Sequence, residues 1–152
     1  MNIRISCEHD NRQIPLVAKT VCHLCVLADT EKRPTKNMEL ALVELLTNII
    51  AYSNAAPPSG MIDLDCRYTG GDFTVTVSDS GNALSTQVAR QYTNGDISMP
   101  GTGSDPIENI ALLPESGWGI QLIKSLCEDV SYKRISGKNI YRLTFDLASA
   151  AA

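Results

Sequence analysis

Alternating apolar and polar positions predict β-strands in several segments of the chain. The clearest pair is Met61–Tyr68 and Phe73–Ser78, in which every second residue is apolar and which flank a Thr-Gly-Gly-Asp turn at residues 69–72. Two such runs around a Gly-Gly turn are typical of a β-hairpin with one buried face. Further strands are predicted at Asn2–Glu8, Val130–Arg134 and Tyr141–Leu147.

Apolar residues at helical spacing predict three helices. The first covers Arg12–Leu27, with Pro15 in the first turn, where a missing backbone N–H costs little. The second follows Thr35, a good N-cap residue, and ends near Ser53, just before the paired prolines at 57 and 58. The third covers Trp118–Cys127.

The stretch Gly81–Ser116 differs from the rest of the chain, because Gly, Ser, Pro, Asn and Asp dominate it. Only a weak helix near Leu84–Tyr92 and a turn near Ile107–Leu112 are predicted there. A weakly structured segment of this length inside a compact domain is typical of a functional lid or a disordered insert. We therefore expect a lid at about residues 82–116, and a frayed tail at Ala148–Ala152.

The elements predict one domain that spans residues 1–152. Their order is strand, helix, helix, hairpin, lid, helix, hairpin. This order favours an α/β (α+β) two-layer sandwich, in which a mixed, largely antiparallel sheet is covered on one face by helices.

Composition and charge narrow the function classes. The formal net charge is -4 and the pI is about 5.1, which argues against direct binding of nucleic acid but leaves nucleotide binding open. The sequence contains no apolar run long enough for a membrane helix, and its N-terminus reads as a strand instead of a signal peptide. We therefore expect a cytoplasmic protein without a membrane partner.

A polar row on the second helix is the first candidate site. Glu44, Asn48 and Tyr52 are spaced by four residues and therefore lie along one face, beside the apolar stripe. A carboxylate suits general-base work, and an amide oxygen suits ligation of a hard metal ion. The alternative is an ordinary solvated row on an amphipathic helix.

Two glycine-containing motifs add to this row. Asp79 and Gly81 follow the second hairpin strand, where a carboxylate could accept a hydrogen bond from an amine and glycine lets a ring approach the backbone. Gly117 and Gly119 open the third helix, where free N–H groups and the helix dipole favour phosphate. Taken singly, these motifs are also typical of a routine turn and of a glycine-rich helix start.

In this order, the three motifs resemble the ATP-binding Bergerat fold of the histidine-kinase-like (GHKL) ATPase superfamily, which includes gyrase, sensor histidine kinases and MutL. The small size and the run Glu-x-x-Thr-Asn at residues 44–48 are similar to the bacterial anti-sigma-factor serine/threonine kinases of the RsbW and SpoIIAB type. The run Gly117–Val130 is similar to the glycine box of that family and its following helix. The resemblance covers nearly the whole chain.

The resemblance implies a role for each motif residue. Asn48 would ligate the Mg2+ that bridges the ATP phosphates, and Glu44 would accept the proton of the substrate hydroxyl. Asp79 would bind the adenine amine, with Gly81 beside the ring.

The glycine box has an implied role as well, and the sequence differs from the family pattern at two positions. Gly117 and Gly119 would let the lid close over the phosphates. The second glycine of the aspartate motif is replaced by Ala83, and a histidine that is common in the family is replaced by Tyr52. Both departures concern catalytic rate and lid geometry more than nucleotide binding.

The resemblance implies a protein kinase that uses ATP and Mg2+ to phosphorylate an anti-anti-sigma (antagonist) protein. It also implies a sigma factor as a second partner, in a system that regulates transcription. A homodimer is left open. The alternative is a non-catalytic, nucleotide-dependent binding module with the same fold, which Ala83 favours.

The cysteines raise the question of a metal or redox site. Cys22 and Cys25 form a Cys-x-x-Cys pair, and Cys7 and His9 lie earlier in the chain. A zinc site needs four convergent ligands, and a redox pair normally sits at a helix start. Because this pair lies within a predicted helix, we expect buried structural thiols.

Overall fold

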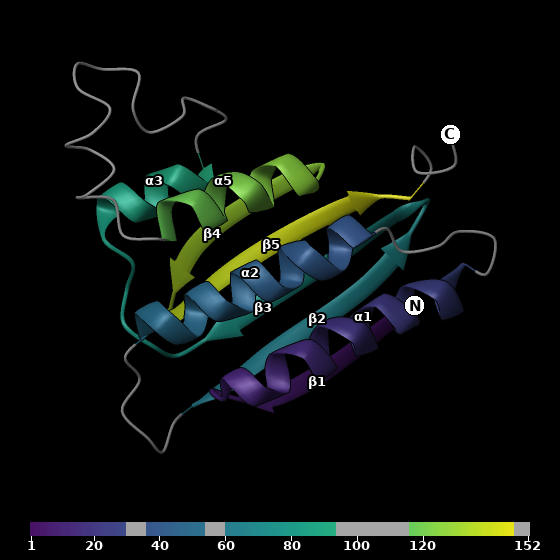
Figure 1. Ribbon diagram of the computed structural model, residues 1–152, viewed down its shortest axis with the longest axis horizontal. Helices are drawn as coiled ribbons and strands as arrows, with labels where there is room; N and C mark the ends of the chain where they lie inside the picture. Colours follow the sequence, from purple (N-terminus) through teal and green to yellow (C-terminus); the bar gives the residue numbers. More distant parts are fainter. Residues whose placement is uncertain (30–35, 54–59, 94–115, 148–152) are drawn as a thin grey trace.

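A computed structural model describes residues 1–29, 36–53, 60–93 and 116–147 of the chain. Its centre is a five-stranded sheet in the order β1-β2-β3-β5-β4, and all four neighbouring pairs are antiparallel (Figure 1). The predicted two-layer α/β architecture is therefore confirmed, with a sheet that is antiparallel throughout the described strands. The strands are β1 (Asn2–Glu8), β2 (Met61–Thr69), β3 (Asp72–Asp79), β4 (Asp129–Ile135) and β5 (Lys138–Asp146).

Two tight turns fix the register of the hairpins. Gly70 and Gly71 join β2 to β3 with φ angles of 64° and 101°, in the left-handed region that glycine adopts without strain. The second hairpin turns at Ser136 and Gly137, and β5 already begins at Lys138. Both strands therefore extend closer to the turn than the predicted strands Val130–Arg134 and Tyr141–Leu147.

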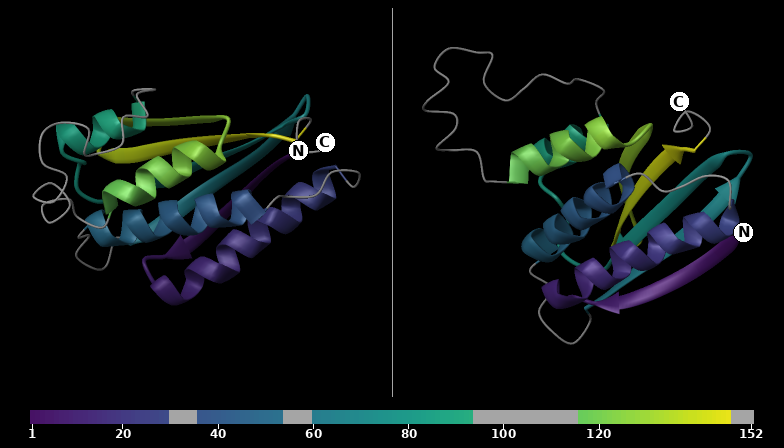
Figure 2. Two further views of the ribbon diagram at one scale, coloured as in Figure 1. Left: turned by 45° about the horizontal axis from the view of Figure 1, so that its top comes forward. Right: turned by 45° about the vertical axis from the view of Figure 1, so that its right-hand side comes forward.

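The described helices lie on one face of the sheet, as the two views of Figure 2 show. They are α1 (Ile14–Ala28), α2 (Lys36–Ser53), α3 (Thr86–Thr93) and α5 (Ser116–Leu126), with a short 3-10 helix, η1 (Asn11–Gln13), before α1. The first helix starts later than predicted, because the Asp10 carboxylate accepts a hydrogen bond from the Arg12 backbone N–H and caps η1 instead. Pro15 lies in the first turn of α1, as expected.

The predicted weak helix after the aspartate motif is present as α3. The rest of the predicted lid from residue 94 on, including the turn near 107–112, lies outside the described residues. So do the Thr35 cap and the tail at 148–152.

The core lies between the sheet and the helices. The alternating pattern of β2, β3 and β5 buries one side of each strand, and the helices contribute their apolar stripes. The largest fully buried side chains include Phe73, Met38, Leu42, Leu45, Ile62 and Leu143.

Truncating Phe73 should cost much of the stability of the fold. Its side chain is 0% exposed and lies opposite Phe145 across β3 and β5. We expect Phe73→Ala to lower the free energy of unfolding by about 3–5 kcal/mol, because it leaves a large cavity. Denaturant unfolding measures this loss. Thr74→Ala, on the opposite face of the same strand, is the matched control and should have a small effect, and equal losses would contradict this view of the core.

The other face of the sheet is polar and carries no helix among the described residues. A hollow of about 300 Å3 on it is lined by residues including Arg67, Thr74, Thr76 and Arg142. None of the predicted site residues lines this hollow, so the candidate site must be sought on the helical side. In the described part of the chain, no helix has the length and apolar character to cross a bilayer.

Candidate functional site

The motif residues lie at one end of the molecule. Figure 1 shows that the C-terminal ends of α2 and β3 and the N-terminal ends of α5 and β5 gather there, with α3 beside them. Asn48 lies near the end of α2, Asp79 ends β3, and Gly117 and Gly119 lie in the first turn of α5.

The polar row of α2 is more buried than a solvated row would be. Asn48 is only 6% exposed, and Glu44 and Tyr52 are partly buried. The apolar stripe beside the row packs into the core, as predicted. The solvated alternative is therefore wrong for Asn48.

Gly119 explains this burial, because α5 packs against the polar row at this glycine. A Cβ atom built on Gly119 would lie 3.1 Å from Asn48 Nδ2, 3.1 Å from Glu44 Oε2 and 3.3 Å from Asn48 Oδ1. Two motifs that lie far apart in the sequence are thus in direct contact. The glycine leaves room for the carboxylate and the amide beside the helix start, where backbone N–H groups favour an anion.

A methyl group at Gly119 should weaken nucleotide binding without unfolding the protein. In Gly119→Ala the new Cβ must push the ends of Glu44 and Asn48 aside, while alanine favours the helix by up to about 1 kcal/mol. We expect a higher Kd for MgATP with an unchanged or higher melting temperature. Calorimetric titration and thermal melts measure the two quantities. Ser125→Ala, exposed on the same helix, is the control, and an unchanged Kd in Gly119→Ala would contradict the proposed role of this contact.

Asp79 is a buried carboxylate, and only one of its two oxygens accepts hydrogen bonds from the described residues. It is 2% exposed, and its Oδ1 accepts hydrogen bonds from the Gly81 backbone N–H at 2.8 Å and from Asn139 Nδ2 at 3.3 Å. Its Oδ2 has no hydrogen-bond partner among the described residues. A buried acceptor without a donor costs free energy. A ligand amine that donates to Oδ2 would remove that cost.

Asn139 is a site residue that the sequence did not reveal. It is 1% exposed, and its Oδ1 accepts hydrogen bonds from Tyr132 Oη and from Arg134, both at 2.8 Å. Its Nδ2 donates to Asn82 O at 2.9 Å as well as to Asp79. Asn139 therefore fixes both the carboxylate and the backbone that follows it.

Arg134 adds a second bond to this loop, because it donates to Gly81 O at 3.0 Å. Gly81 is buried, and Ala83 is exposed. The replaced glycine therefore lies outside the tight part of the loop.

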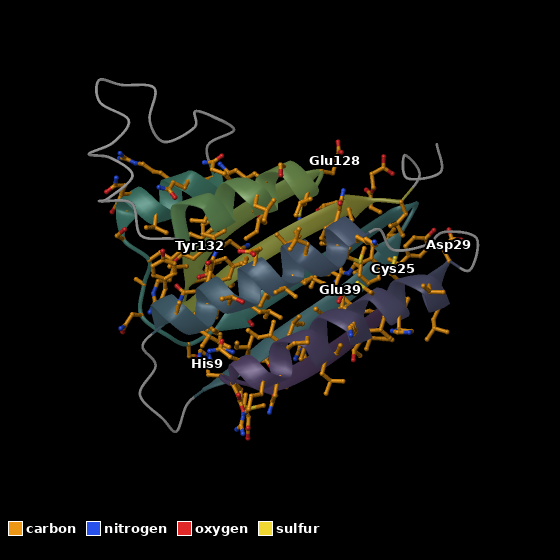
Figure 3. The ribbon with its side chains drawn as sticks, viewed as in Figure 1. His9, Cys25, Asp29, Glu39, Glu128 and Tyr132 are labelled. Atoms are coloured by element: carbon orange, nitrogen blue, oxygen red, sulfur yellow. The ribbon has the colours of Figure 1, made fainter. Side chains whose placement is uncertain are left out.

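Three tyrosines connect the Asp79 end of the site to the Asn48 end. The ring centroids of Tyr92, Tyr132 and Tyr141 lie between 5.1 and 6.1 Å apart. Figure 3 labels Tyr132, which lies at the same end of the molecule as the motif residues. Burial raises the pKa of Tyr92, an effect that the Asn48 side chain partly offsets, and burial also raises the pKa of Tyr141.

The cysteines behave as core residues, as predicted. Cys7, Cys22 and Cys25 are buried free thiols, and burial raises the pKa of Cys22 to about 12 and that of Cys25 to about 11. Within the described ranges, no group of three or more His, Cys, Asp and Glu side chains could hold a metal ion.

We expect these thiols to react slowly in the folded protein. Because the thiolate is the nucleophile, a raised pKa leaves almost none of it at pH 8, and burial blocks the reagent as well. Titration with a thiol reagent should show slow reaction of Cys22 and Cys25 in buffer and fast reaction in denaturant. Rapid native labelling at these positions, identified by peptide mapping, would contradict the assignment.

The donor set fits a magnesium nucleotide. An amide oxygen is a suitable ligand for a hard cation, a buried carboxylate oxygen can accept from an exocyclic amine, and a helix start can bind phosphate. Asn48, Asp79 and the first turn of α5 carry these three kinds of group at one end of the fold.

Comparison with known proteins identifies the family of this chain. The sequence pattern of the histidine kinase-like ATPase domain family matches residues 7–145. Comparison with curated proteins found no match. Among solved structures 23 chains match, including the Acinetobacter baumannii histidine kinase AdeS, with 14% identity, 95% of this chain and 68% of that chain covered, and a TM-score of 0.49. Because the family pattern spans most of the sequence, this chain belongs to the histidine kinase-like ATPase domain family.

Proposed function

We propose that the protein binds ATP with Mg2+ and transfers the γ-phosphoryl group to a serine or threonine of a partner protein. The observation that carries this proposal is the contact of Gly119 with both Glu44 and Asn48. It puts a carboxylate, an amide and a helix start within one small region. Phosphoryl transfer depends mainly on such positioning and charge neutralisation.

Each residue has a defined task in this reaction. Asp79 holds the adenine amine through Oδ2, and Asn48 holds the metal ion. Glu44 accepts the proton of the attacking hydroxyl while the new oxygen–phosphorus bond forms. The bond between the γ-phosphorus and the bridging oxygen breaks, and ADP carries the electron pair away.

The partner is proposed from the likeness to anti-sigma-factor kinases of the RsbW and SpoIIAB type. We propose a small antagonist protein as the phosphoryl acceptor and a sigma factor as the competing partner, in the cytoplasm. The Glu-x-x-Thr-Asn run and the glycine box support this choice over the sensor histidine kinases of the same superfamily.

A second candidate function is a nucleotide-dependent binding regulator without catalysis. Ala83, which replaces the second glycine of the aspartate motif, favours it. In that case the same pocket would bind ATP, but no phosphoryl group would be transferred.

One experiment separates the two candidates. The purified chain is incubated with extract of its native cell and with γ-labelled ATP and Mg2+, and the labelled proteins are identified by phosphosite mapping. The kinase proposal expects one small protein labelled on serine or threonine, and far less label with Glu44→Gln. ATP binding without any label dependent on this chain would favour the non-catalytic regulator.

A further inference from the structure

Tyr92 is the buried residue of α3. It is 2% exposed, and no other residue of this helix is buried. Its ring packs edge-on against Tyr141, with centroids 5.4 Å apart and an interplanar angle of 68°, and lies 6.1 Å from the ring of Tyr132. Such edge-to-face pairs are favourable beyond the area that they bury.

This ring lies between the two ends of the candidate site. On one side, Tyr92 interacts with the Asn48 side chain. On the other side, Tyr132 donates to Asn139, which in turn donates to Asp79. Tyr141 also lies close enough to Asp79 for the two to interact electrostatically.

A nucleotide that joins these ends needs the same space. With its adenine at Asp79 and its phosphates at Asn48, ATP would cross the region that the Tyr92 ring fills. Protein interiors are close-packed, so the ring and the nucleotide cannot both occupy it.

We propose that Tyr92 is an internal occupant of the nucleotide pocket, and that ATP binds only when α3 withdraws this ring. The inference rests on the proposed function and adds a regulatory step to the same site. A contact that stabilises α3 in this position therefore opposes nucleotide binding, and a contact that stabilises the displaced helix promotes it.

The attachment of α3 suits such a movement. The helix has only eight residues, and short helices depend on tertiary contacts for their stability. The partly buried Val88 of α3 also packs against the core, as does Leu84 just before the helix, whose backbone N–H donates to Tyr132 Oη at 3.5 Å. Tyr92 is nevertheless the one fully buried side chain of α3.

The test is stopped-flow binding of a fluorescent ATP analogue with Mg2+ to the full chain and its variants. Removing the ring in Tyr92→Ala should lower Kd by about tenfold or more, because the competent state is no longer rare. The observed association rate of the unaltered protein should level off at high nucleotide concentration, whereas that of Tyr92→Ala should rise linearly.

Two further variants distinguish the loss of the Tyr92 ring from a general destabilisation of the protein. Tyr92→Leu keeps apolar volume in the core and should also bind more tightly than the unaltered chain. Val88→Ala weakens a different and less buried contact of the same helix, and should tighten binding by less than either Tyr92 variant. Amide NMR spectra show whether each variant is folded.

The outcomes separate this inference from the proposed function. Tighter binding by Tyr92→Ala and Tyr92→Leu supports both. If the unaltered chain binds ATP and both variants bind equally or more weakly, the ring is a binding platform and the inference is overturned, while the proposed function stands. If no folded protein binds ATP, the proposed function fails, and the inference fails with it.

Discussion

Replacing Glu44 with glutamine should greatly slow phosphoryl transfer while leaving ATP binding intact. Glutamine keeps the size of the side chain and its place beside Gly119, but it cannot accept the hydroxyl proton. Loss of a general base typically costs about 10²–10⁴ in rate. We therefore expect single-turnover transfer of the γ-phosphoryl group to fall by that factor, with Kd for MgATP unchanged.

Glu39→Gln is the matched control. Glu39 lies on the same helix and is partly buried, but it faces α1, where it lines a groove with Lys19 and Cys22 (Figure 3). Its substitution should change neither transfer nor binding. If Glu44→Gln retained the transfer rate of the unaltered protein, Glu44 would not be the base.

Replacing Asp79 with asparagine should have the largest effect on nucleotide affinity. Asparagine can still accept from the Gly81 backbone N–H, so the loop should survive. The amide nitrogen of the asparagine would then face the adenine amine. Two hydrogen-bond donors would thus oppose each other at the position where the Asp79 carboxylate is the acceptor in the unaltered protein. Hydrogen bonds to charged groups are worth about 1.5–3 kcal/mol, so we expect Kd for ATP to rise by about 10- to 100-fold.

The base of the nucleotide provides an internal check. Inosine triphosphate lacks the exocyclic amine, so the unaltered protein should bind it far more weakly than ATP, and Asp79→Asn should lose this preference. Asp65→Asn, which lies on the open face of the sheet in an ion pair with Arg4, serves as the control. Unchanged ATP affinity in Asp79→Asn would exclude the carboxylate from adenine recognition.

Local patterns explain why so much of the fold could be predicted. The hairpin of β2 and β3 is encoded by alternation and by two glycines that adopt positive φ angles. The polar row and the apolar stripe of α2 follow from helical spacing alone. The roles of Glu44, Asn48 and Asp79 in catalysis and binding stay predictions, although the contact of Gly119 with two of them adds support.

The site residues that the sequence does not reveal depend on contacts between segments that are far apart in the sequence. Asn139 lies 60 residues from Asp79 in the sequence, and only the register of β3 and β5 brings the two opposite each other. Because the turn residues Ser136 and Gly137 lie close by, the sequence pattern does not show that Asn139 belongs to a strand. Tyr92 reads as a weak helical position, and only the packing of α3 against Tyr141 shows where its ring lies.

The central claim is that Asn48, Asp79 and Gly119 belong to one ATP pocket, and an amide NMR titration with MgATP tests it most directly. The backbone amides of Gly81 and Gly119 should shift together and yield one common Kd. If MgATP moved neither amide, or moved only one of the two, the two ends would not share a ligand and the account would be wrong.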